Sequence, residues 1–486
     1  MSSGVKYLLA GIGAVVLLGG GIAAMKLTEP DNSATDDTSS VAEEETLADI
    51  YTGDVNNLVS VEVVNSAGGY TMKRTAAGTE ETQAVFDLDG LEGIAREDSL
   101  VSSFGQNAST LSPVMLIDEN ASDLAKFGLD NPIAEVTLTF DGADTQKVTL
   151  LLGSDSPAGD TYVKLKDSPA VYTASSSFIK TYTYEKEYFV SKTVLAEPDE
   201  EDYPVVEKIE IERTDMEKPV VFEYTGENES GGTSATHVMT SPVKAYLDVS
   251  SSVSYTHGLF GLNAAGVLSI SPSEEELEVA GIKEPLCTVT MTVEGGKKYV
   301  LKIGTAYTGS EESQPGHIGY FEGTDILWKF DDTDIPWVSM KPEDAMSSLV
   351  FGSYIYDLKS LEVTASGNTD KFEFTGTEAE DYKVKLNGKD FDAERYKLFY
   401  QALIKAPAEE ICTSDEGIGS LLASFVLKYN NGNADETIEF YEAEDNRVII
   451  RKDGETCFKC HASFVKKSLL PNILAVGGDA DFVTNW

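Results

Sequence analysis

The chain has 486 residues, and its 82 acidic side chains against 37 basic ones give a formal net charge of −45. Its 41% hydrophobic and 9% aromatic content is ordinary for packed domains and excludes a wholly disordered chain, while its length predicts about three domains. So negative a surface repels phosphate backbones, and no nucleic-acid partner is expected. The acidic excess is typical of an exported protein that needs to stay soluble. Loose binding of divalent cations or of a basic partner is the alternative.

The first segment predicts a membrane anchor. Residues Tyr7 to Met25 form an uncharged run between Lys6 and Lys26. Nineteen helical residues reach about 28 Å, close to the thickness of a bilayer core. Residues 1–27 are therefore expected to be a single-pass transmembrane signal-anchor, although signal-peptide cleavage near Ala23 or Ala24 is an alternative.

The next segment predicts the orientation in the membrane. Residues 28–49 carry eight acids and no base, which is typical of an acidic, disordered stalk. The basic residue on the short N-terminal side places that side in the cytoplasm. We therefore expect the bulk of the chain on the extracytoplasmic side of the cell membrane.

The remainder contains three divergent copies of one unit. The strand-like hexads SVEVVN, KIEIER and SLEVTA begin at Ser60, Lys208 and Ser360, and each alternates apolar and polar residues. Further on, FGLDNPIAEVTLTF matches AGIKEPLCTVTMTV without a gap, and EGIGSLLASFVLKY matches both more weakly. The predicted repeat units are residues 50–197, 203–353 and 354–474, followed by a tail at 475–486.

Within each unit the pattern predicts an antiparallel α+β fold. A hairpin is followed by a helix, which begins near Arg96 in the first copy and after a capping Asp392 in the third. In the first copy we expect a short helix, ENASDLAKF, capped by Asp118 and ended by Gly128. A four-strand meander follows, and SSSFIKTYTYEKEYFV is predicted to close the unit as a helix.

These elements resemble a bacterial family of domains of unknown function, family 4340. The resemblance is carried by DLAKFGLDNPIAEVTLTF, LLGSDSPAGDTYVKLKDSPAVYT and SFIKTYTYEKEYFVSKTVL, over about residues 58–350 and more loosely over 354–474. It implies an exported, membrane-tethered protein of the kind found beside auxiliary components of ABC exporters, including the gliding-motility type. It supplies no catalytic residues.

One motif suggests chemistry. Cys457, Cys460 and His461 fit C-x-x-C-H, the attachment sequence of c-type haem. However, KDGETCFKCHASFVK aligns with KDSPAVYTASSSFIK of the first copy, which predicts a buried strand that leads into a helix start. A reactive thiol at Cys460, near that helix start, is a further alternative. Cys287, which aligns with a core strand position, is expected to be a small core residue.

No other constellation predicts a site. The four histidines have no metal-ligand spacing, and no nucleophile elbow, Walker loop or dinucleotide glycine motif is present. No catalytic residue, metal ligand or cofactor is therefore predicted. The leading hypothesis is a non-enzymatic, membrane-anchored accessory or binding protein, with ABC-transporter subunits or another envelope protein as partner. A redox or c-type haem protein that uses residues 457–461 and a cell-envelope hydrolase are the alternatives.

Overall fold

The computed structural model describes residues 47–48, 50–79, 82–111, 114–141, 146–175, 179–226, 235–309 and 314–483. The chain divides into two units, residues 1–48 and 49–486. Of the first unit only strand β1 (Leu47–Ala48) is described, so the predicted anchor at Tyr7 to Met25 lies outside the described residues. Among the residues that are described, no helix has the length and apolar character needed to span a bilayer.

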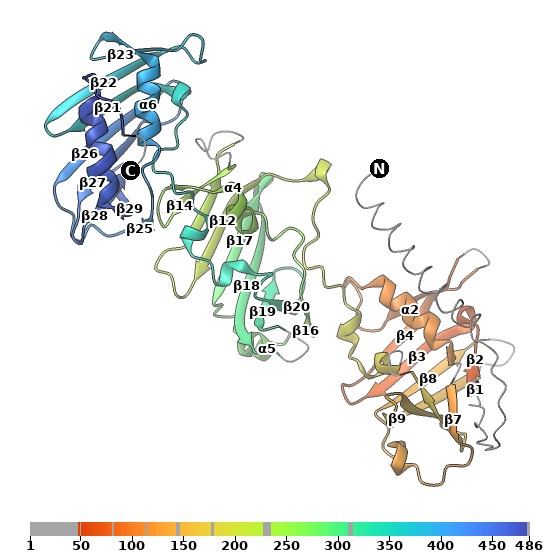
Figure 1. Ribbon diagram of the computed structural model, residues 1–486. Coiled ribbons are helices and arrows are strands. Elements are labelled where there is room, and N and C mark those ends of the chain that lie inside the picture. Colours follow the sequence, from red (N-terminus) through yellow and green to blue (C-terminus); the bar gives the residue numbers. More distant parts are fainter. Residues whose placement is uncertain are drawn as a thin grey trace, which may run out of the picture. The chain divides into compact units, whose positions relative to one another are not determined.

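The second unit contains three large antiparallel sheets, in agreement with the predicted α+β class (Figure 1). The first sheet has the order β7-β11-β10-β9-β8-β3-β4-β5. Its strands are β3 (Leu58–Asn65), β4 (Tyr70–Ala76), β5 (Val85–Leu88), β7 (Val114–Asp118), β8 (Ala134–Phe140), β9 (Gln146–Asp155), β10 (Thr161–Leu165) and β11 (Val171–Ala174). A fourth, two-stranded sheet pairs β2 (Tyr51–Thr52) with β6 (Thr110–Leu111).

The second sheet has the order β16-β20-β19-β18-β17-β12-β13-β14-β15. Its strands are β12 (Val206–Arg213), β13 (Val220–Tyr224), β14 (His237–Ser241), β15 (Ala245–Tyr246), β16 (Gly266–Ile270), β17 (Cys287–Val293), β18 (Lys297–Tyr307), β19 (Gly316–Phe321) and β20 (Ile326–Asp331).

The third sheet has the order β25-β29-β28-β27-β26-β21-β22-β23-β24. Its strands are β21 (Leu358–Ala365), β22 (Asn368–Thr375), β23 (Lys383–Leu386), β24 (Lys389–Phe391), β25 (Glu410–Ile411), β26 (Leu421–Tyr429), β27 (Glu436–Glu442), β28 (Arg447–Lys452) and β29 (Glu455–His461).

The three sheets share strand order and register. The predicted hexads form β3, β12 and β21, and each pairs with the strand predicted after the glycine. The central pairs Val61↔Leu138, Ile209↔Met291 and Leu361↔Leu427 occupy the same place in each sheet. Alternate burial along β8 and β17 fixes this register, because a slip of one residue would turn the buried face toward solvent.

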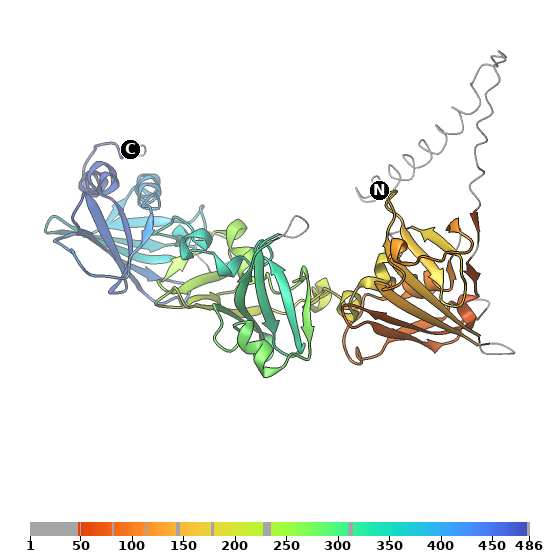
Figure 2. The same ribbon diagram turned by 90° about the horizontal axis from the view of Figure 1, so that it is seen from below.

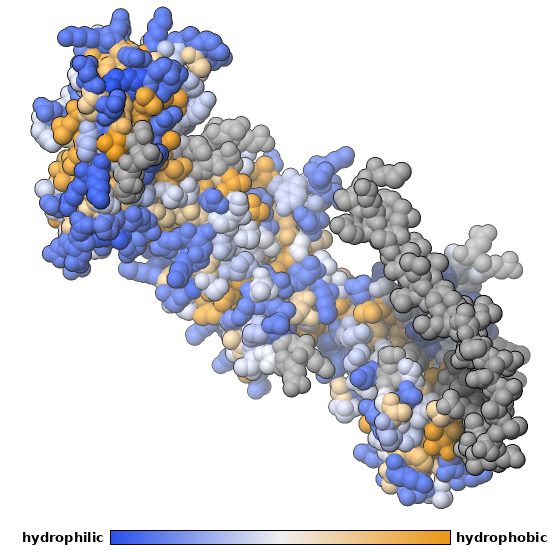
Figure 3. All heavy atoms as spheres, in the orientation of Figure 1, coloured by the Kyte–Doolittle hydropathy of each residue, from blue (hydrophilic) through white to orange (hydrophobic). Residues whose placement is uncertain are grey.

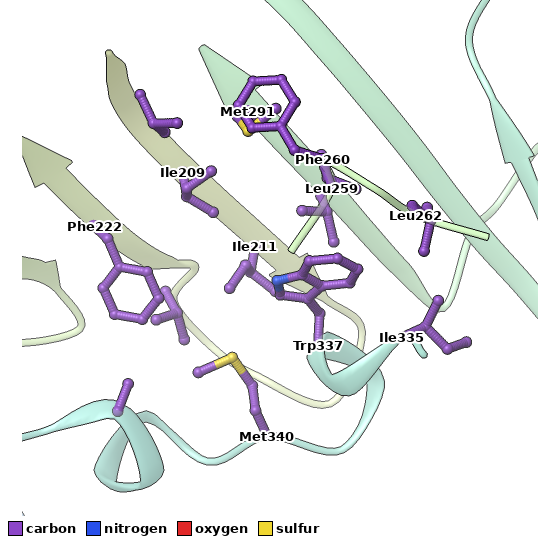
Figure 4. Packing of buried hydrophobic residues seen from close by; sticks show 14 of the residues in the cluster. Ile209, Ile211, Phe222, Leu259, Phe260, Leu262, Met291, Ile335, Trp337 and Met340 are labelled. Carbon is purple, nitrogen blue, oxygen red and sulfur yellow. The ribbon is translucent and has the colours of Figure 1, made fainter. Parts of the chain in front are cut away.

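Each sheet carries helices on one face (Figures 1 and 2). The main helices are α2 (Asp98–Ala108), α4 (Val249–Thr256) and α6 (Ala393–Leu403). As predicted, Asp392 caps α6, because its carboxylate accepts a hydrogen bond from the amide of Glu394. Behind these helices lies the core, which in the second sheet centres on Trp337, packed near Ile211, Leu259 and Met340 (Figure 4).

Shorter helical segments complete the three parts. They are η1 (Val55–Asn57), η2 (Ala125–Phe127), η3 (Lys180–Thr183), η4 (Lys186–Phe189), η5 (Glu200–Asp202), α5 (Glu274–Val279), η6 (Glu294–Gly296), η7 (Pro336–Val338), η8 (Pro342–Ala345), η9 (Ile355–Asp357), α7 (Ala462–Phe464), the π-helical η10 (Val465–Leu469) and α8 (Leu470–Ala475).

Two predicted helices of the first copy are wrong. The segment before Gly128 forms only the 3₁₀ turn η2, and Asp118 ends strand β7, where its carboxylate accepts from the amide of Asn120. Gly128 itself has the left-handed conformation expected of a helix-ending glycine.

The second wrong prediction is the helix that was expected to close the first unit. Residues 176–178 lie outside the described part, and the next elements are two 3₁₀ turns, η3 and η4. The side-chain amide of Asn65 donates to the carbonyls of Tyr182 and Tyr184, both at 2.9 Å, and so takes acceptors that a helix would use. After the third sheet, the described residues form a longer helical segment here, from α7 to α8.

The predicted tail is packed against the third sheet's helices up to the last described residue. The guanidinium of Arg395 donates to the carbonyls of Ala475, Gly478 and Ala480. Asn472 exchanges two hydrogen bonds with the backbone of Val483.

Candidate functional site

A buried ion pair lies at the end of the β27–β28 hairpin. Nζ of Lys452 is 2.8 Å from Oε1 of Glu436, and the two side chains are only 2% and 6% exposed. The ammonium also donates to the carbonyl of Val350 at 3.3 Å and lies 4.6 Å from the centroid of the Tyr246 ring. Burial alone would lower the pKa of Lys452, but the surrounding Tyr246 and Glu436 outweigh it and raise that pKa. Lys452 therefore stays charged in the folded chain.

A chain of hydroxyl groups extends from this pair. The hydroxyl of Tyr429 donates to Oε2 of Glu436 at 3.1 Å, and Oγ of Ser353 lies 2.5 Å from the same hydroxyl. Tyr400, on α6, donates to the carbonyl of Ser353 at 2.6 Å. Burial raises the pKa of both tyrosines, so they remain neutral donors at physiological pH.

The hydroxyl chain ends at the wall of an apolar pocket. This pocket, of about 320 Å³, lies between the linker 349–355 and helix α6. Its apolar walls are Leu349, Phe351, Tyr354, Ile355 and Ile404. The surface beside it is also apolar, since Tyr354 is 57% exposed, and hydrophobic residues are visible among hydrophilic ones over this helical side (Figure 3).

Three of the polar side chains at the pocket are already bonded, and a fourth, Gln401, is exposed at the rim. Ser353 and Tyr400 serve the buried network, and Lys397 at the rim forms a 2.8 Å ion pair with Glu394. A pocket of this composition receives an apolar group, because burying a further polar group would require a partner that the walls do not offer.

The C-x-x-C-H residues lie on strand β29, which has the place in the third sheet that β11 has in the first. Cys457 and Cys460 are 2% and 0% exposed, and both are free thiols. Burial raises the pKa of Cys457, and raises that of Cys460 to about 12. The predicted buried strand agrees with this placement, whereas a reactive thiolate at Cys460 would need the opposite shift of its pKa.

His461 is used locally. Its ring caps α7, because Nδ1 accepts from the amide of Ser463 at 3.3 Å, and its Nε2 lies 3.4 Å from the side-chain amide of Asn446. A haem held by this motif would need two sulfur atoms and this ring to face one exposed ligand. The buried sulfur atoms and the capping ring do not present such a face.

Two histidines that are far apart in the sequence lie together in the second sheet. The rings of His237 and His257 are perpendicular, with centroids 5.4 Å apart. Nδ1 of each lies within 2.9 Å of the hydroxyl of the preceding threonine, and Nε2 of His237 is 2.7 Å from the carbonyl of Val206. Burial lowers the pKa of both rings, and that of His257 falls to about 4 with an added contribution from His237.

These histidines do not form a recognisable metal centre. In the described ranges no group of three or more His, Cys, Asp or Glu side chains could hold a metal ion. His317 is engaged elsewhere, with Nδ1 2.7 Å from Oδ1 of Asp332. Sequence spacing gave no signal for the pair, because the contact forms only when β14 and the end of α4 are packed together.

Comparison with known proteins identifies a family for part of the chain. Residues 87–285 match the family described as Domain of unknown function (DUF4340). The matched segment begins in β5 of the first sheet and ends just before β17 of the second. No curated protein and no solved structure matches the chain.

The buried ion pair generates a test by paired substitution. Lys452→Met or Glu436→Leu alone should lower the free energy of unfolding by about 3–5 kcal/mol, because each leaves a buried charge without its partner. The double variant should recover most of that loss. Urea unfolding of the four proteins checks this, and a double variant that is as unstable as the sum of the single ones would contradict it.

The cysteines generate a second test. None of the thiols should react with a thiol-specific dye within minutes at pH 8 in the native chain, and four should react after unfolding in urea. The purified chain should also lack a haem absorption band in the visible range. Rapid labelling of Cys457 or Cys460 in the native state would show that β29 opens readily.

The histidine pair predicts acid sensitivity. Because the folded chain keeps both rings neutral, the unfolded chain takes up protons first as the pH falls below 6.5, and stability is lost from there down to about 4. The loss should be on the order of 1–2 kcal/mol. A His257→Gln variant should show a shallower decline in thermal midpoint between pH 7 and 4.5 than the parent chain, and an equally steep decline in both would contradict this.

Proposed function

We propose that this chain is a non-enzymatic binding protein, anchored in the cell membrane by its N-terminal segment and acting on the extracytoplasmic side. The observation that carries the proposal is the apolar pocket beside α6, whose lining residues Ser353 and Tyr400 are already bonded within the buried network. An accessory protein needs such a surface to hold a partner. Subunits of an ABC exporter, which the family resemblance suggests, are the partner that we propose.

The shared sheets fit this role. We infer that the three sheets are divergent copies of one unit, because their strand orders and central registers coincide. Repeated units of one fold are well suited to act as spacers or as several binding surfaces, and the fold by itself assigns no chemistry. The third copy differs most in sequence and carries the pocket.

The two alternative functions have less support. A redox or haem role for Cys457, Cys460 and His461 would require a face that the burial of both thiols and the capping role of His461 do not provide. A cell-envelope hydrolase would need a carboxylate pair at a cleft, whereas Glu436 is bonded to Lys452 and Tyr429, and Glu394 is paired with Lys397 at the rim of this pocket.

The proposal is tested by crosslinking from the pocket rim in native membranes. A photo-crosslinking residue replaces Gln401, which is exposed at the rim, and in a control chain it replaces Val279, which is 75% exposed in the second sheet region. We expect an envelope protein, identified by mass spectrometry as an exporter subunit, to be captured from position 401 only. Adding Ile404→Glu should lower the yield about ten-fold, because it places a charge in the apolar wall.

Two results would overturn the proposal. One is equal capture of the same proteins from positions 401 and 279. The other is capture of no envelope protein from position 401, with or without Ile404→Glu.

A further inference from the structure

The face of the third sheet opposite its helices is hollowed and rich in lysine. The hollow measures about 550 Å³ and extends over strands β21, β22, β23, β24 and β26. Its lysines are Lys359, Lys371, Lys383, Lys385 and Lys428, and its acids are Glu362, Glu373 and Asp390. In a chain with 82 acidic residues against 37 basic ones, this face reverses the local sign of charge.

The fold does not require these lysines. The first two sheets keep the same registers with other residues at the equivalent positions. Lys371 corresponds to Thr71 and Val221, all three opposite a glutamate. Lys428 corresponds to Thr139 and Thr292. Lys385 corresponds to Asp87 and Val238.

Internal ion pairs account for only part of the positive charge. Lys371 lies 3.0 Å from Glu373, and Lys428 lies 3.5 Å from Asp435. Within the described part of the chain, Lys383 and Lys385 have no carboxylate within 4.0 Å, although they lie two residues apart on one face of β23. Two adjacent exposed ammonium groups repel each other, and a bound anion relieves that repulsion.

The chemistry of the lining defines the ligand. Lysine interacts with phosphate as a point charge. Arginine, which binds carboxylates through two parallel hydrogen bonds, is absent from the described lining residues. The three acids between the lysines would repel a bare polyanion but accept hydrogen bonds from hydroxyl groups. We propose that this face binds a phosphate-bearing polyol or glycan chain, with phosphates on Lys383 and Lys385 and hydroxyl groups on Glu362 and Glu373.

Geometry and screening favour a chain over a membrane surface. A flat bilayer cannot enter a hollow on a sheet face, whereas a thin flexible chain can. The net charge of −45 repels anions at long range, but at physiological salt charges more than about 8 Å away are largely screened. Among the residues that line the hollow, the five lysines outnumber the three acids. This surface is separate from the pocket beside α6, so the proposal holds or fails independently of the proposed function.

The test uses the purified full-length chain and a poly(glycerol phosphate) probe, with binding measured by calorimetry. Lys383→Gln with Lys385→Gln should weaken binding about three- to thirty-fold, as expected for the loss of two exposed ionic contacts. The matched control, Lys466→Gln with Lys467→Gln, removes two exposed lysines outside the hollow. It should change the affinity for the probe less than about two-fold. Binding should weaken further as salt is raised.

Three comparison ligands distinguish specific binding of the chain from non-specific charge attraction and from binding to a membrane surface. Tighter binding of the glycerol phosphate chain than of inorganic polyphosphate, with none for uncharged dextran, supports the proposal. Equal or tighter binding of polyphosphate, or an equal effect of both double variants, shows non-specific charge attraction and overturns it. Absence of binding to the probe also overturns it, as does binding to phosphatidylglycerol vesicles alone.

Discussion

The buried pair of Lys452 and Glu436 is the constraint on which the third sheet and its pocket depend. Taking two charges out of water costs several kcal/mol for each ion, and the cost is offset only when further hydrogen bonds satisfy the remaining atoms. Here Val350 accepts from the ammonium and Tyr429 donates to the carboxylate. The linker before the third sheet is thereby fixed to the β27–β28 hairpin.

That constraint also decides the character of the pocket. Ser353 and Tyr400 line the pocket, yet Oγ of Ser353 is bonded to Tyr429, which donates to Glu436, and the hydroxyl of Tyr400 donates to the carbonyl of Ser353. Apart from Lys397 and Gln401 at the rim, the side chains that remain to line the pocket are aliphatic and aromatic. A polar network that is complete within itself stabilises one arrangement of its neighbours.

The sequence allowed the sheets to be predicted better than the site. Strands that begin near Ser60, Lys208 and Ser360 follow from the alternation of apolar and polar residues, and that alternation also determines their register. The two 3₁₀ turns that replace the predicted closing helix could not be predicted. They depend on Asn65, more than a hundred residues earlier, which donates to the carbonyls of Tyr182 and Tyr184. Lys452 and Glu436 resemble the many solvated charges of this chain, since only the packing of the linker and α6 buries them. The interpretation of Cys457 and Cys460 as strand positions succeeded because it rested on alignment between copies and not on the short motif.

Comparison of the three sheets separates what the fold needs from what each copy presents. The buried positions of the central strands stay apolar in all three, as at Val61, Ile209 and Leu361, because each must fill the space beneath a helix. The opposite face is not under that constraint. There the same register carries Thr139 in the first sheet, Thr292 in the second and Lys428 in the third. Substitutions on this face can change the charge that the sheet presents without changing how the sheet folds, so we expect functional differences among the three sheets on that face.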